Sequence, residues 1–152
     1  MVLAQRRRFE RIYTIELDRK LYEQALLRFK KCRHVTALQG DSGVVLPQLV
    51  NSLPDGVLFW LDGHWSDGIT AHGDKATPIV AELDAILSRD RSNDVILIDD
   101  ARCFTGDCDY PSVIDIAEMI HRQRPELVFS VDVDIIRVVP PTISVQYERP
   151  IL

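Results

Sequence analysis

Short apolar runs alternate with amphipathic stretches along this chain, and this alternation restricts the possible folds more than any other feature. Six runs have the length and residue types of strands, namely 11–17, 34–39, 56–62, 94–99, 127–131 and 134–139. Most of them are almost continuously apolar, which is typical of strands that are covered on both faces. The order strand, helix, strand therefore predicts an α/β fold with a Rossmann-like, mostly parallel sheet and helices on both faces.

Between these runs, apolar residues recur at helical spacing. Helices are expected over 19–31, 44–53 and 77–87, and a further one after Pro111. Thr77 and Pro78 resemble an N-cap and a first helical residue, and Pro47 is compatible only with the first turn of its helix. The inward faces are expected to carry Leu21, Ala25, Leu26, Phe29, Val80, Leu83, Ile86, Leu87, Ile114, Ala117 and Ile120. The last two strands are joined so closely that they must form an antiparallel hairpin.

Length and composition restrict the class of protein. A chain of 152 residues with 46% apolar residues suits a single domain, 1–152, with a real core. The net charge of −5 argues against a nucleic-acid partner bound through its phosphates. The chain has no long apolar run, and its three cysteines cannot all form pairs, so we expect a cytoplasmic protein with reduced thiols and no membrane partner.

Four of the strands end on acidic residues. These residues are Glu16, Asp41, Asp62 and the pair Asp99–Asp100. In open α/β sheets, ligands bind beyond the carboxyl ends of the strands, whereas a carboxylate in the middle of a buried strand would be costly. The acids therefore mark the edge of the sheet where a functional site is expected.

The first two strand ends suit a nucleoside. Glu16 could accept hydrogen bonds from two vicinal ribose hydroxyls, and Asp41 with Ser42 lies where the edge of a base could be read. The alternatives are structural. Glu16 could be a surface carboxylate or a helix cap, in competition with Asp18, and Asp41 and Ser42 could cap the helix that follows them.

The other two strand ends suit a metal ion. Neighbouring strands lie about 4.8 Å apart, so Asp62, Asp99 and Asp100 can converge on one hard divalent cation such as Mg²⁺. The alternative is that Asp99 or Asp100 caps the following loop or pairs with Arg102. His64 follows on a glycine-rich loop, where it is a candidate general base or a loop residue bonded to backbone.

Taken in order, "IYTIELD", "ALQGDSG", "LFWLDGH" and "ILIDDAR" resemble the class I S-adenosylmethionine (SAM)-dependent methyltransferases from about Phe9 to Pro140. The motifs "LDGHWS" and "LIDDAR" are most similar to the metal-assisted O-methyltransferases of the macrocin and novobiocin type. This resemblance implies that Glu16 holds the SAM ribose and that Asp41 and Ser42 lie at the adenine. It also implies Asp62, Asp99 and Asp100 as Mg²⁺ ligands, with Asp62 also beside the cofactor and His64 as the base. The acceptor would be a small hydroxylated metabolite or a sugar.

The chain departs from that family in one respect. Relatives begin with a strand and a glycine-rich loop that passes under SAM, but the first glycine here is Gly40. We therefore expect a domain without its first strand, with two unpaired strand edges that favour a homodimer. One alternative function is a non-catalytic remnant of the fold. Another is a metal-dependent hydrolase built on Asp62, His64, His72 and Asp74.

Overall fold

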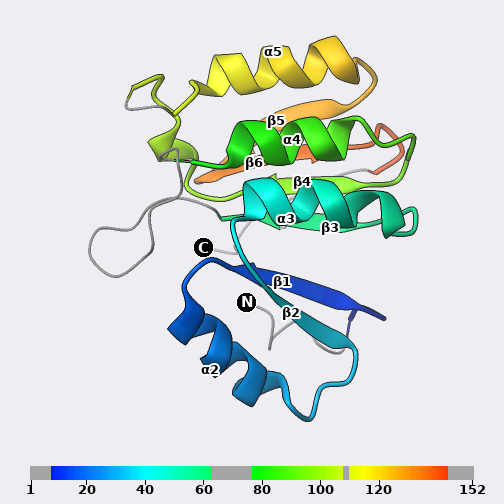
Figure 1. Cartoon of the computed structure of the whole chain (residues 1–152). Helices are drawn as coiled ribbons and strands as arrows, with labels where there is room; N and C mark the ends of the chain where they lie inside the picture. Colours follow the sequence, from blue (N-terminus) through cyan, green and yellow to red (C-terminus); the bar gives the residue numbers. More distant parts are fainter. Residues whose placement is uncertain (1–7, 63–76, 108–109, 144–152) are drawn as a thin grey trace, which may run out of the picture. The chain divides into compact units, whose positions relative to one another are not determined.

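The computed structural model describes residues 8–62, 77–107 and 110–143 of the chain. Within these residues, strands and helices alternate as the sequence predicts (Figure 1). The strands are β1 (Ile12–Glu16), β2 (Val35–Gln39), β3 (Leu58–Leu61), β4 (Val95–Ile98), β5 (Val128–Asp132) and β6 (Ile135–Val139). The α-helices are α2 (Arg19–Phe29), α3 (Ser42–Leu49), α4 (Ile79–Leu87) and α5 (Val113–Gln123), and the 3₁₀ turns are η1 (Val50–Ser52) and η2 (Ala101–Cys103).

The described strands form two sheets. One is the parallel pair β1–β2, and the other has the order β3–β4–β6–β5. In the second sheet β3 and β4 are parallel, whereas β6 is antiparallel to both β4 and β5, so the predicted C-terminal hairpin is confirmed. The chain divides into two compact units, residues 1–52 with 63–89 and residues 53–62 with 90–152, and each is described here by itself.

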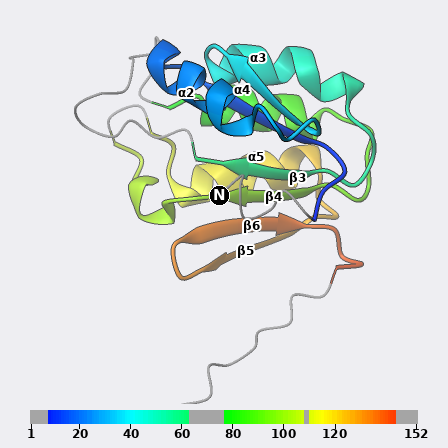
Figure 2. The ribbon, with the colours of Figure 1, turned by 90° about the horizontal axis from the view of Figure 1, so that it is seen from below.

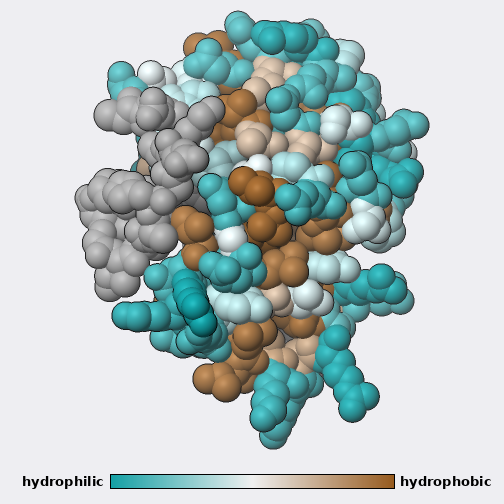
Figure 3. Space-filling model, in the orientation of Figure 1, coloured by the Kyte–Doolittle hydropathy of each residue, from teal (hydrophilic) through white to brown (hydrophobic). Residues whose placement is uncertain are grey.

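In the first unit, α2 connects the two parallel strands but buries none of its residues. Leu21 and Leu26, which were predicted to face inward, are 38% and 45% exposed, while Tyr22, Ala25 and Phe29 are half-buried. A sheet of two strands offers too little surface to cover a helix of eleven residues. Apolar side chains consequently reach the surface in the lower part of Figure 3, where α2 lies.

The other two helices of this unit pack against each other, and their boundaries differ from the prediction. α3 begins at Ser42 rather than Val44, so Pro47 lies inside the helix instead of in its first turn. α4 begins at Ile79, one residue later than expected, and the hydroxyl of Thr77 accepts the N–H of Ile79 at 3.3 Å. The buried face of α4 consists of Ile79, Glu82, Leu83, Ile86 and Leu87, whereas Val80 is 39% exposed.

The core of the second unit lies on one face of its sheet. Phe59 is in register with Ile96 and Ile96 with Val138, and all three are buried. The next row along the strands is Leu61, Ile98 and Ile136, of which Ile136 is fully buried. Figure 2 shows β4 and β6 side by side in this sheet. Burial of one such side chain contributes about 1.5–3 kcal/mol, so these two rows are a main source of stability for the unit.

Helix α5 also differs from the prediction in the face that it buries. It carries Ile116 and Ile120 inward, four residues apart, while Ile114 is 70% exposed. Pro111 lies before the helix, and Ser112 caps it. Residues four apart share a helix face and residues six apart do not, so Ile116 rather than Ile114 lies on the face of Ile120.

Four strand edges have no partner among the described residues, because β1, β2, β3 and β5 each pair on one side only. The open edges of β1 and β3 are two of these four. In the part of the chain that the structure describes, no helix is long and apolar enough to cross a membrane.

Candidate functional site

In the first unit, two predicted site residues lie at the carboxyl ends of β1 and β2. Glu16 ends β1 in register with Gln39, which ends β2. The N–H of Gly40 donates to the carbonyl of Glu16 at 3.0 Å, and Asp41 follows directly. Gly40 has a φ of 145° and a Cβ there would be 2.8 Å from Val45 Cγ2, so a side chain would not fit. The carboxyl ends of the two strands are therefore held together by backbone bonding and by a required glycine.

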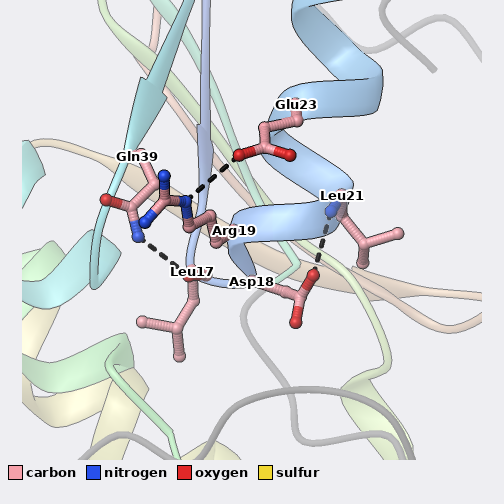
Figure 4. Close-up of polar contacts among 6 residues, drawn as sticks. All are labelled: Leu17, Asp18, Arg19, Leu21, Glu23 and Gln39. Carbon is pink, nitrogen blue, oxygen red and sulfur yellow. Dashed lines mark hydrogen bonds and ion pairs between the residues drawn. The ribbon is translucent and has the colours of Figure 1, made fainter.

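The carboxylate of Glu16 is oriented by its own chain. Its Oε1 accepts the N–H of Asp18 at 3.0 Å, and Asp18 in turn caps α2 by accepting the N–H of Leu21 at 2.9 Å. Figure 4 shows this turn, in which Gln39 Nε2 also donates to the carbonyl of Leu17 at 3.2 Å. Asp18 rather than Glu16 is therefore the helix cap, and Glu16 is half-buried at the end of its strand.

Asp41 has the structural role that the sequence offered as an alternative. It is the N-cap of α3, and its Oδ1 accepts the N–H of Gly43 at 2.8 Å. Ser42 is the first helical residue. Capping orders this turn and does not exclude ligand binding by the same residues.

Sequence reasoning did not identify Glu82. This side chain is only 3% exposed, and burial raises the pKa of its carboxyl group, with a smaller contribution from Asp41 and an opposing one from Ser42. Its Oε2 has no hydrogen-bond partner in the described residues. The signal was available in the helical spacing, because Glu82 lies three residues after Ile79 and four before Ile86, on the buried face.

In the second unit, Asp62 and Asp99 follow two neighbouring parallel strands. Leu61 is in register with Ile98, and the N–H of Asp99 donates to the carbonyl of Leu61 at 2.9 Å. The two aspartates therefore lie at the same edge of the sheet, as predicted. Asp62 is exposed, and Asp99 is half-buried with its Oδ1 accepting the N–H of Asp100 at 3.0 Å.

Asp100 pairs with an arginine. Its Oδ1 lies 2.6 Å from Arg102 Nη1, and the same Nη1 contacts Asp134 in the β5–β6 turn. The hydrogen bond that Arg102 donates to the Asp100 carboxylate raises the pKa of the Arg102 guanidinium. Asp134 also binds the backbone, accepting the N–H of Arg102 through its side chain at 2.9 Å. The predicted alternatives of a loop contact for Asp99 and an Arg102 pair for Asp100 are thus both present.

These contacts bear on the predicted metal site. All three residues already take part in interactions, and the described residues contain no group of three or more His, Cys, Asp or Glu side chains arranged to hold a metal ion. On these residues alone, the donor set does not fit Mg²⁺. His64, the candidate base, lies outside the described residues, as do His72 and Asp74.

Two surface hollows lie elsewhere. One, of about 190 Å³, is in the second unit and includes Asn93, Arg124 and Pro140. The other, of about 490 Å³, includes Glu10, Arg33 and His34, at the opposite end of β1 and β2 from Glu16. Neither is lined by a predicted site residue. We therefore rely on the strand ends rather than on these hollows to locate the candidate site.

Comparisons with known proteins show the fold. No protein-family model matches the chain. No curated protein matches it either. Among solved structures it is similar to the "putative caffeoyl-CoA O-methyltransferase from Staphylococcus aureus", with a TM-score of 0.50 and 11% identity over 85% of this chain. The match covers 64% of that protein, so this chain spans less than two thirds of its length. The likeness shows the α/β, Rossmann-like fold alone.

Proposed function

We propose that this chain is a SAM-dependent methyltransferase-like domain that transfers a methyl group to an oxygen of a small hydroxylated acceptor. The observation that carries the proposal is the arrangement of Glu16 and the Asp41–Ser42 turn at the carboxyl ends of two adjacent parallel strands. This edge is where open α/β sheets bind nucleotides. The fold shared with an O-methyltransferase supports the reaction class.

Different residues of the chain would bind different parts of SAM. Glu16 presents a carboxylate whose second oxygen can accept hydrogen bonds from a ribose, while its first is held by Asp18. Asp41 and Ser42 lie at the start of α3, where they would contact the adenine of SAM. In the reaction, the acceptor oxygen would attack the methyl carbon in line, the C–S bond of the sulfonium would break, and the acceptor proton would pass to a base. His64 is the candidate for that base.

The main contribution of the protein in such a reaction is to position two bound reactants, because methyl transfer needs the acceptor oxygen, the carbon and the sulfur in line. SAM supplies an activated methyl group, and no metal is required to balance the reaction. We therefore derive no step through a divalent ion. Mg²⁺ at Asp62, Asp99 and Asp100 stays a prediction from the sequence.

Calorimetric titration with SAM tests the proposal. We expect the wild-type chain to bind SAM and Glu16→Gln to weaken binding about tenfold, since loss of a hydrogen bond to a charged group costs about 1.5–3 kcal/mol. Glu23→Gln is the matched control, because Glu23 is an exposed glutamate of α2 paired with Arg19 at 3.1 Å. Equal affinities of the two variants would contradict the role of Glu16.

The same titration separates the alternatives. A folded wild-type chain that binds no SAM would support the non-catalytic remnant. Mg²⁺ binding without SAM binding would support the hydrolase. Mg²⁺ binding that Asp99→Asn abolishes, together with SAM binding, would establish the predicted metal site.

A further inference from the structure

The larger of the two surface hollows lies where β1 and β2 begin, and the proposed methyl transfer makes no use of it. Its volume is about 490 Å³, within the range of small-molecule sites. Because the two strands are parallel, they begin at the opposite end of the pair from Glu16 and the turn into α2 (Figure 1). The residues that line the hollow are Glu10, Arg11, Tyr13, Arg33, His34 and Thr36.

Strand pairing brings polar residues of two segments together at this hollow. Tyr13 is in register with Thr36. The N–H of Ile12 donates to the carbonyl of His34 at 2.9 Å, so the pairing continues to the residues just before both strands. Arg11 lies two residues before Tyr13, and side chains two residues apart in a strand point to the same side. Arg11 and Thr36 are exposed and Tyr13 is 37% exposed, so a ligand can reach the hollow from solvent.

The hollow has an excess of positive charge. Arg11 and Arg33 carry guanidinium groups that are always ionised, whereas Glu10 is the acid among the lining residues. Within the described residues, neither guanidinium forms an ion pair. Lys30 and Lys31, both exposed, lie just before Arg33 in the chain. Although the net charge of the chain is −5, this end of the first unit therefore attracts anions.

Two arginines in one hollow favour phosphate groups over other anions. A guanidinium presents its N–H groups as a planar fork that matches two oxygens of a phosphate. Arg11 precedes β1 and Arg33 precedes β2, so the hollow receives one fork from each segment. Such an arrangement suits two linked phosphate groups better than a single one. The hydroxyl groups of Tyr13 and Thr36 add neutral hydrogen-bond donors.

We propose that this hollow is a second binding site, which takes a diphosphate group, either as the free anion or as part of a phosphorylated small molecule. Arg11 and Arg33 bind the phosphate oxygens, and Tyr13 and Thr36 donate hydrogen bonds through their hydroxyl groups. This inference does not depend on the proposed function, because SAM carries a sulfonium cation and is assigned to the other end of the strands. A chain that binds no SAM can still bind a diphosphate.

Calorimetric titration with inorganic pyrophosphate tests the site. The salt concentration is held at about 0.15 M, where attraction between distant charges is screened. We expect the wild-type chain to bind with a dissociation constant below about 1 mM. Arg11→Ala and Arg33→Ala should each weaken binding about tenfold, because each removes charge-assisted hydrogen bonds. Arg33→Lys keeps the charge but not the fork, so its affinity should fall between those of wild type and Arg33→Ala.

Arg28→Ala is the matched control. Arg28 is an exposed arginine in the last turn of α2 that does not line the hollow, and its removal changes the net charge equally. We expect this variant to bind pyrophosphate as wild type does. An equal loss in Arg28→Ala would show diffuse attraction and overturn the site, as would a folded wild-type chain that does not bind. If the alanine variants do not fold, Arg33→Lys decides, because wild-type affinity in that variant would also overturn the proposal.

Backbone amide signals followed by NMR locate the bound anion. With pyrophosphate, we expect the largest changes at residues 10–13 and 33–36, whereas changes confined to residues 16–18 and 40–43 would overturn the assignment.

Titrations with uridine diphosphate and uridine distinguish the two sources of the diphosphate group. Affinity for uridine diphosphate about tenfold above that for pyrophosphate would identify an ester whose base stacks on Tyr13. Equal affinities would identify the free anion. Uridine that binds as tightly as uridine diphosphate would overturn the proposal, because the phosphates would then contribute nothing.

Discussion

At the scale of single residues, the sequence predicts where the strands end, and hence where four acids lie, but it does not predict one buried acid. Glu16, Asp41, Asp62 and Asp99 follow apolar runs, and a run of that kind almost fixes where a parallel strand ends. Glu82 was missed because its polarity argues for the surface, whereas its place between Ile79 and Ile86 puts it inside.

Val133 is a second residue whose environment the sequence does not reveal. It has a φ of 57° in the two-residue turn between β5 and β6, and it is 95% exposed. A β-branched residue is strained at positive φ, and this turn is nevertheless tied down because Asp134 binds Ala101 and Arg102.

We expect Val133→Gly to raise the free energy of unfolding by roughly 0.5 kcal/mol. Relief of left-handed strain, worth about 1–2 kcal/mol, exceeds the entropy that the more flexible glycine loses on folding. Urea denaturation measures the change. Val131→Gly in β5 is the control and should lower stability. A decrease for Val133→Gly of the same size would show that the turn is unstrained.

At the scale of elements, the order and type of helices and strands follow from the sequence, but the helix faces do not. Apolar spacing after Pro111 fits more than one face of a helix. Ile116 is four residues before Ile120 and shares its buried face, whereas Ile114 is six residues before it and is exposed. α2 shows a different limit. Its amphipathic pattern is correct, yet a helix buries its apolar face only where the sheet beneath it is wide enough.

The capping box of α5 provides a test at this scale. The Ser112 hydroxyl accepts the N–H of Asp115 at 3.1 Å, and the Asp115 carboxylate accepts the N–H of Ser112 at 2.8 Å. The bond that the Ser112 hydroxyl donates to the Asp115 carboxylate at 2.7 Å, followed by the bond from the Ser112 N–H, lowers the pKa of Asp115. We expect Ser112→Ala to lower the free energy of unfolding by about 1 kcal/mol. Ser92→Ala, at an exposed serine before β4, should stay within about 0.5 kcal/mol of wild type. Equal effects would show that the cap does not stabilise α5.

At the scale of the whole molecule, the sequence predicts the α/β class and the C-terminal hairpin, and the strand pairing adds that the described strands form two sheets. Pairing cannot be read from one strand at a time, because it depends on which edges meet. The open edges of β1 and β3 are the consequence. Such edges favour association with another chain.

We expect sedimentation to give a particle of about twice the chain mass of 17.3 kDa. The backbone N–H groups of successive residues in a strand point to opposite sides of it. The N–H of Ile12 donates on the side of β2, so the N–H of Tyr13 points to the open edge of β1. Tyr13→Pro should therefore weaken the dimer and preserve the β1–β2 pair, whereas Thr14→Pro should disrupt that pair. A stable wild-type monomer would contradict this prediction.

The account depends most on the claim that SAM binds at the carboxyl ends of β1 and β2. Backbone amide signals followed by NMR during a SAM titration test this directly, since each amide reports its own surroundings. We predict that the largest changes fall on Glu16 to Asp18 and on Gly40 to Gly43. Changes confined to the hollow near Glu10 and His34, or no changes at all in a folded protein, would contradict the assignment.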